Sequence, residues 1–142
     1  MMVVEEREKK ILAVYTLEPW EHALTYLRYR SPAQELGWKV IRGVEKDLVS
    51  IEPIREADYV IIQRIFPHLR EQYQQVVETA RIYQKPLIYE IDDLLIAVPA
   101  DHPCVEWYRP LLEDIIVAML DADRVVVSSS LLAEIFSAFN PD

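Results

Sequence analysis

The chain has 142 residues, of which 51% are hydrophobic and 27% charged, with a net charge of −9. This length and composition predict one folded domain with a substantial core and exclude a largely disordered chain. The 24 acidic residues against 15 basic ones oppose binding to a phosphate backbone, so no nucleic-acid partner is expected. Cys104 is the only cysteine, which excludes an internal disulfide and a cysteine-rich zinc site.

The first ten residues are predicted to form a charged tail before a domain at 11–142. The tail begins with four apolar residues and continues with mixed charges, whereas a signal peptide places its charges first. No apolar run is long enough to span a bilayer. The sequence therefore predicts no integral membrane segment and a cytoplasmic protein, either free or peripheral to the membrane.

Five short apolar runs rich in Val, Ile and Tyr recur along the chain, and polar or helical patterns separate them. Nearly continuous apolar runs are typical of strands that are buried on both faces of a parallel sheet. The predicted strands are residues 11–17, 39–44, 59–63, 87–91 and 124–128.

The segments between these strands carry helical patterns. Ser31, Pro32 and Gln34 resemble a capping box at a helix start, and Gly37 is the expected left-handed cap at its end. The other predicted helices are a short turn from Pro53 that ends before Asp58, a helix over 68–84, a helix from Pro110 and a helix over 131–139.

Alternating strands and helices predict an α/β fold, a Rossmann-like doubly wound parallel sheet in the order 3-2-1-4-5 with helices on both faces. In that order the ligand crevice lies between the first and fourth strands. Two long connections, 18–30 and 92–109, flank it and are expected to carry function. The only glycines are Gly37 and Gly43, so a glycine-rich phosphate loop is excluded.

Two arginines are candidate binding residues. Arg30 precedes the predicted helix at Ser31, whose free N–H groups favour a carboxylate, a phosphate or a sugar hydroxyl. Arg64 follows the third strand, and its side chain can point toward a bound anion. For both side chains the alternative is an ion pair with one of the many acidic residues.

The second long connection supplies Asp92, Asp93 and His102. Alternation along the preceding strand predicts that the two aspartates point apart, one into the crevice and one onto the turn. A carboxylate there can bind a hydroxyl or a cation or act as a base, or it can cap backbone amides. His102 can bind a hydroxyl or transfer a proton, or it is an exposed loop residue without a role. No metal site is predicted.

The segment 85–95, Lys-Pro-Leu-Ile-Tyr-Glu-Ile-Asp-Asp-Leu-Leu, resembles the N-terminal domain of bacterial GT-B glycosyltransferases of the group 1, family 4-like type. The same resemblance extends in order through most of residues 11–139. Its other parts are Arg30 with Pro32, Leu36 and Gly37, the run 57–64, Val98-Pro99, His102-Pro103, and the run 122–128 with Leu132 and Phe136.

This resemblance implies a hexosyltransferase with two Rossmann-like domains, in which the N-terminal domain shapes the acceptor side. It also implies that the nucleotide-sugar is a substrate held by a C-terminal donor domain absent from this chain, that no cofactor is needed, and that residues 1–142 alone are inactive. The sequence departs from many relatives at Glu18-Pro19-Trp20, where they have a glycine-rich turn, so no donor-phosphate contact is expected in this loop. The alternative is a non-catalytic α/β protein-interaction module, because such folds host many functions.

Overall fold

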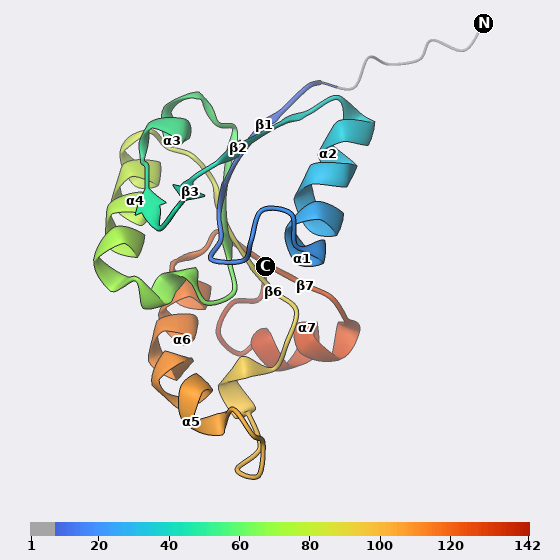
Figure 1. Ribbon diagram of the computed structural model, residues 1–142, viewed down its shortest axis with the longest axis vertical. Helices are drawn as coiled ribbons and strands as arrows, with labels where there is room; N and C mark the ends of the chain where they lie inside the picture. The colour runs from blue at the N-terminus through green and yellow to red at the C-terminus, as the bar shows by residue number, and fades with distance from the viewer. Residues whose placement is uncertain (1–7) are drawn as a thin grey trace, which may run out of the picture.

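Five parallel strands form the centre of the molecule in the computed structural model, which describes residues 8–142 (Figure 1). The predicted α/β class with a parallel sheet and helices on both faces is confirmed. The strands are β1 (Ile11–Tyr15), β2 (Lys39–Arg42), β5 (Tyr59–Gln63), β6 (Leu87–Ile91) and β7 (Arg124–Val127).

The strand order differs from the predicted 3-2-1-4-5. The sheet runs β2-β1-β5-β6-β7, which is 2-1-3-4-5 when the five parallel strands are counted along the chain. The third strand, β5, therefore lies between β1 and β6, with Leu12 opposite Tyr59 and Val60 opposite Leu87. Its central residues Val60 and Ile61 point to opposite faces and are both buried, as a central strand requires.

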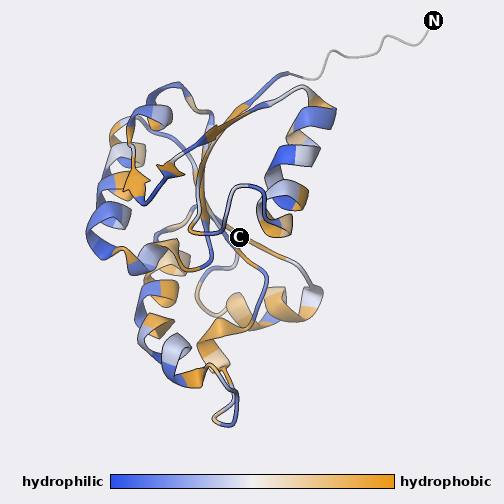
Figure 2. Cartoon of the chain, viewed as in Figure 1, coloured by the Kyte–Doolittle hydropathy of each residue, from blue (hydrophilic) through white to orange (hydrophobic). Residues whose placement is uncertain are grey.

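Four helices cover one face of the sheet: α3 (Glu52–Glu56), α4 (Arg70–Ile82), α6 (Leu112–Asp121) and α7 (Ser130–Phe136). The predicted 68–84 helix corresponds to α4, and its apolar side, which includes Tyr73, Val76 and Ala80, is buried here. Figure 2 shows mostly hydrophobic strands and a largely hydrophilic outer side of α4. Burial of apolar residues thus explains the main core.

The opposite face is covered by one continuous helical segment after β1. It consists of α1 (Ala23–Thr25), a π-helical turn (Tyr26–Arg30) and α2 (Ser31–Leu36). The predicted capping box at Ser31 is wrong, because the Ser31 N–H donates to the carbonyl of Tyr26 within this helical segment. No free helix N-terminus therefore stands beside Arg30. Gly37 ends α2 with φ 68°, which confirms the left-handed cap.

A small hairpin that the sequence did not predict follows β2. Its strands are β3 (Val44–Glu45) and β4 (Leu48–Val49), and the turn places Lys46 and Asp47 at φ 50° and 62°. The sequence signal was weak because such turns usually carry Asn or Gly.

The other predicted long connection, 92–109, contains short helical elements. They are a 3₁₀ turn (Leu95–Ala97), α5 (Val105–Tyr108) and part of a 3₁₀ turn (Arg109–Leu111) that leads into α6; another 3₁₀ turn, Phe66–His68, precedes α4. At the start of α7 the Ser129 hydroxyl accepts a hydrogen bond from the Leu132 N–H and so caps the helix. No helix within residues 8–142 is long and apolar enough to cross a membrane.

Candidate functional site

The observed strand order moves the topological switch point. From β1 the chain passes to β2 on one side and then to β5 on the other side, so the switch point lies between β1 and β5. The crevice predicted between the first and fourth strands is therefore wrong. Ligands in open α/β sheets bind beyond the carboxyl ends of the strands at a switch point, which here means the residues after Tyr15 and Gln63.

Arg64 stands at this point with an unusual backbone. It follows β5 directly and has φ 47°, in the left-handed region, where a non-glycine residue costs about 1–2 kcal/mol. Two contacts with β6 hold it there. The Arg64 N–H donates to the Glu90 carbonyl at 2.9 Å, and the Tyr89 hydroxyl donates to the Arg64 carbonyl at 2.7 Å.

The Arg64 guanidinium contacts three carboxylates from two different loops. Its nitrogens lie 2.8 Å from Glu18, 3.3 Å from Asp92 and 3.0 Å from Asp93. Burial lowers the pKa of Arg64, but the carboxylates of Asp92, Glu18 and Asp93 outweigh it and raise that pKa overall. We call these four residues the Arg64 cluster. It carries a net charge of −2 with all four groups ionised.

Exposure differs within the Arg64 cluster. The side chains of Arg64 and Asp92 are 13% and 14% exposed, whereas that of Asp93 is 55% exposed. Both aspartates contact the same guanidinium, so the prediction that they point apart is wrong. The reason is that β6 ends at Ile91, and strand alternation does not govern residues beyond the strand. Asp93 is thus the carboxylate most open to a ligand.

A buried polar network lies beside this cluster and links three strand ends. The Thr16 hydroxyl donates to Gln63 at 2.5 Å, the Gln63 amide donates to Glu90 at 2.9 Å, and the Tyr29 hydroxyl donates to the same Glu90 oxygen at 3.0 Å. The Glu18 N–H also donates to Thr16 at 3.0 Å, which connects the network to the Arg64 cluster. These hydrogen bonds hold the side chains in one arrangement, although the second oxygen of Glu90 has no hydrogen-bond partner among the described residues.

Glu90 is the buried acid of this network, with 2% of its surface exposed. Burial raises its pKa, while hydrogen bonds from Gln63 and Tyr29 and the charge of Arg28 act in the opposite direction. Arg28 lies 3.7 Å from its second oxygen. Burial and the neighbouring Glu90 also raise the pKa of Tyr29 well above its ordinary value, so this hydroxyl stays a hydrogen-bond donor.

The predicted site residues fall into two groups. Arg64, Asp92 and Asp93 are brought together. Arg30 instead makes its contacts within its own segment: it pairs with Glu21 at 2.8 Å and stacks over the Trp20 ring at 5.5 Å.

His102 also stays within its own loop. Its ring nitrogen accepts a hydrogen bond from the Cys104 N–H at 3.0 Å, and the ring packs edge-on against Tyr108. For Arg64 and Arg30 the ion-pair alternative is the observed one. Two buried polar residues at strand ends, Gln63 and Glu90, carry the network. Glu90 was expected near the crevice together with Asp92, Asp93 and His102, whereas Gln63 was not a predicted site residue. The signal for them was a polar residue inside an apolar run.

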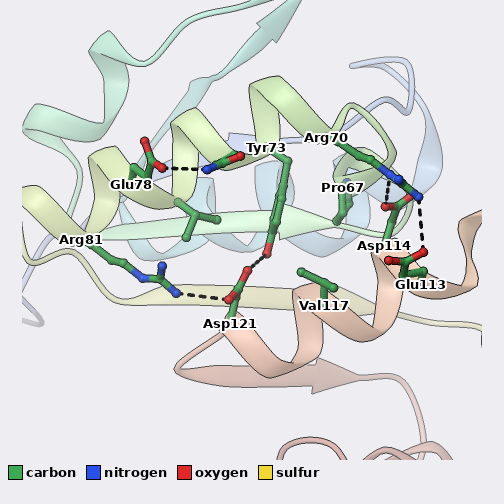
Figure 3. A pocket seen from close by; sticks show the side chains of 11 residues that line it. Pro67, Arg70, Tyr73, Glu78, Arg81, Glu113, Asp114, Val117 and Asp121 are labelled. Atoms are coloured by element: carbon green, nitrogen blue, oxygen red, sulfur yellow. Dashed lines mark hydrogen bonds and ion pairs between the residues drawn. The ribbon is translucent and has the colours of Figure 1, made fainter.

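Apart from the switch point, a hollow of about 350 Å³ lies between α4 and α6 (Figure 3). At one end Asp121 accepts from Tyr73 at 2.9 Å and pairs with Arg81 at 3.2 Å. At the other end the Arg70 guanidinium pairs with Asp114 at 2.6 Å. This hollow lies between two outer helices, and the charged groups at each end are already paired, Arg70 with Asp114 and Arg81 with Asp121, so the switch point is the better candidate site.

The Arg64 cluster offers hydrogen-bond acceptors around one donor. Within residues 8–142, no group of three or more His, Cys, Asp or Glu side chains is arranged to hold a metal ion. The guanidinium occupies the space between the carboxylates. Such a mixed set is suited to a ligand with several hydroxyl groups, and its negative charge opposes a phosphate. The sequence matches no protein-family model and no curated protein.

Proposed function

We propose that this chain is the N-terminal, acceptor-side domain of a GT-B glycosyltransferase that moves a sugar from a nucleotide-sugar to a hydroxyl-bearing acceptor. The observation that carries the proposal is the position of Asp92 and Asp93. They belong to the Tyr-Glu-Ile-Asp-Asp segment of the family resemblance, and they lie with Arg64 and Glu18 beside the switch point of the sheet.

The charge of the site supports an acceptor role over a donor role. A nucleotide-sugar brings a diphosphate, and a surface with a net charge of −2 repels it. The chain also has no glycine-rich loop to hold phosphates. In this proposal the donor binds a second domain, and the acceptor hydroxyls donate to Asp93 and Asp92 and accept from Arg64.

Arg30 and His102 have secondary roles in this proposal. Both lie in the segments after β1 and β6, the same two segments that contain Glu18 and the two aspartates. The Arg30 guanidinium over the Trp20 ring keeps that segment ordered, and His102 is exposed enough to contact an extended acceptor. The nucleotide-sugar is a substrate, and no further cofactor is part of the proposal.

The proposal is tested by Asp93→Asn and Asp92→Asn in the full-length gene product. Loss of a charged hydrogen-bond acceptor is expected to cost about 1.5–3 kcal/mol, or about ten- to a hundredfold in kcat/KM. The assay is transfer of labelled sugar from a panel of nucleotide-sugars. Asp101→Asn is the matched control, because Asp101 is an exposed aspartate in the same loop, and it should leave the rate unchanged.

Two results would contradict the proposal. Wild-type turnover in both variants would remove the aspartates from the acceptor site. Robust transfer by residues 1–142 alone would contradict the two-domain arrangement, because a site built between two domains needs both faces for transition-state binding. The absence of any transfer by the full-length product would favour the non-catalytic interaction module.

A further inference from the structure

The two faces of the sheet are covered unequally. Parallel sheets are normally covered by helices on both faces, and here α3, α4, α6 and α7 pack on one face. On the other face, the buried cluster comprises Leu12, Val14, Tyr29 and Ile61, from β1, β5 and the helical segment after β1. Ile88 of β6 is only partly buried there, and Val126 of β7 is 41% exposed.

A shallow groove of about 360 Å³ runs over this open part of the sheet. Its floor includes Leu12, Ile61, Ile88 and Val126. It extends from the level of Tyr59 at the start of β5 to the level of Glu90, which pairs with Gln63 at the end of β5. The four steps from Tyr59 to Gln63 along β5 span about 13 Å, which corresponds to about nine residues of an α-helix.

The polar groups along the groove differ in their partners. At the Glu90 end the carboxylate is buried and hydrogen-bonded by Gln63 and Tyr29. Midway along the groove, at the level of Ile88, Arg124 is exposed, and no ion pair joins it to any of residues 8–142. Arginines elsewhere on the surface, such as Arg70 and Arg81, have carboxylate partners. An unpaired cation beside an apolar floor favours an apolar partner that carries an anion.

We propose that this groove docks an amphipathic α-helix of a partner protein, whose apolar side covers Ile88 and Val126 and whose acidic side chain pairs with Arg124. A helix supplies the layer that this half of the sheet lacks. A second copy of this chain fits less well, because each copy has a net charge of −9 and the two copies repel each other. An acyl chain fits less well, since the floor is open at Val126. The proposal rests on the fold and is independent of the transferase activity.

The test uses a synthetic helical peptide of about 16 residues, with leucines spaced i, i+3, i+4 and i+7 and one Glu beside the middle of this stripe, since Arg124 lies at the level of Ile88. A matched peptide has Lys in place of that Glu. Titration of the chain, followed by methyl NMR, should shift the Ile88 and Val126 signals with the Glu peptide. Val126→Asp should abolish these shifts, because it places a charge in the apolar floor.

Charge exchange tests the role of Arg124. Arg124→Glu should weaken the Glu peptide about three- to tenfold and favour the Lys peptide, as expected for a partly exposed ion pair. Lys46→Glu makes the same charge change on the β3–β4 hairpin, where the exposed Lys46 is remote from the groove, and it should leave the affinities unchanged.

Four outcomes would overturn the proposal. They are an absence of methyl shifts at millimolar peptide, equal affinity for the Glu and Lys peptides, concentration-dependent dimerisation through this face in sedimentation, and shifts caused by dodecanoate but not by the peptide. None of these outcomes bears on the transferase proposal, because the groove floor and Arg124 share no residue with the Arg64 cluster.

Discussion

Two arginine–carboxylate clusters in this molecule are built in opposite ways. In the Arg64 cluster one cation, 13% exposed, lies among three carboxylates at the ends of parallel strands. Between α4 and α6 the buried group is instead the carboxylate of Asp114, 7% exposed, while its partner Arg70 is 63% exposed (Figure 3). Arg64 has a left-handed backbone, whereas Arg70 begins a regular helix.

The difference separates a structural contact from a candidate site. The Arg70 guanidinium pairs closely with Asp114 and at 3.8 Å with the exposed Glu113, and His68 Nδ1 lies 3.2 Å from Asp114, so this contact joins two helices and leaves little of Asp114 for a ligand. At the Arg64 cluster three carboxylates share one cation, and Asp93 stays largely accessible. The strained backbone of Arg64 is kept by its surroundings, a property that is concentrated at functional sites.

Removal of the central cation should have the largest effect on stability. Arg64→Ala leaves three neighbouring carboxylates without a partner, two of them largely buried, and we expect a loss of about 3–5 kcal/mol in the free energy of unfolding. Arg70→Ala should cost less, about 1–3 kcal/mol, because it leaves only one buried carboxylate, Asp114, and His68 Nδ1 still lies 3.2 Å from it. Urea denaturation of the two variants measures both values. Equal losses would show that the clusters are alike.

The left-handed backbone can be tested at the same position. Arg64→Gly loses the same ion pairs as Arg64→Ala, but glycine adopts φ 47° without strain. We expect Arg64→Gly to be about 1 kcal/mol more stable than Arg64→Ala. At Arg70, the first helical position of α4, the order should reverse, with alanine the more stable residue by less than about 1 kcal/mol. If alanine were the more stable residue at position 64, the left-handed conformation would be contradicted.

The smallest expected effect is a pH dependence at Glu90. Burial raises its pKa above the ordinary value of 4.5, so the folded state holds the proton more tightly than the unfolded state. The resulting stabilisation is fully present below that ordinary value and is lost as pH rises through the folded pKa. Glu90→Gln does not titrate, so its stability relative to the wild type should improve as pH rises.

Urea denaturation of Glu90→Gln and the wild type between about pH 4 and pH 7 measures this change. Glu35→Gln is the matched control, because Glu35 is an exposed glutamate on α2, and its stability difference should not show this trend. A difference for Glu90→Gln that stays constant with pH would mean that water reaches Glu90 in the folded state.

The elements of the fold were predictable from local patterns. The five apolar runs became the five strands of the sheet, the stripe of Tyr73, Val76 and Ala80 became the buried side of α4, and Gly37 ended α2. These features depend on residues close together in the chain. The prediction that a helix begins at Ser31 was wrong, because the residues before Ser31 are already helical. The capping pattern at Ser31 does not indicate what precedes it.

The site was predictable only in part. The sequence indicated that Arg64, Asp92 and Asp93 carry the chemistry at strand ends. It did not indicate that Arg64 is their common partner, because that contact depends on β5 lying next to β6. With the predicted order, Arg64 would have been several strands away from Asp92. The contacts of Arg30 with Trp20 and Glu21 also depend on the helical path of the first connection.

The sequence alone determined the α/β class, the strand and helix segments, the acidic surface and the identity of the polar residues that follow the strands. The tertiary structure decided which strands are neighbours, the left-handed turn at Arg64 and the meeting of Glu18, Asp92 and Asp93 around one guanidinium. The physical reason is that hydrophobic periodicity records which side of an element is buried but not against which element. Strand order is a choice among long-range pairings with similar local patterns, and the site is a product of that choice.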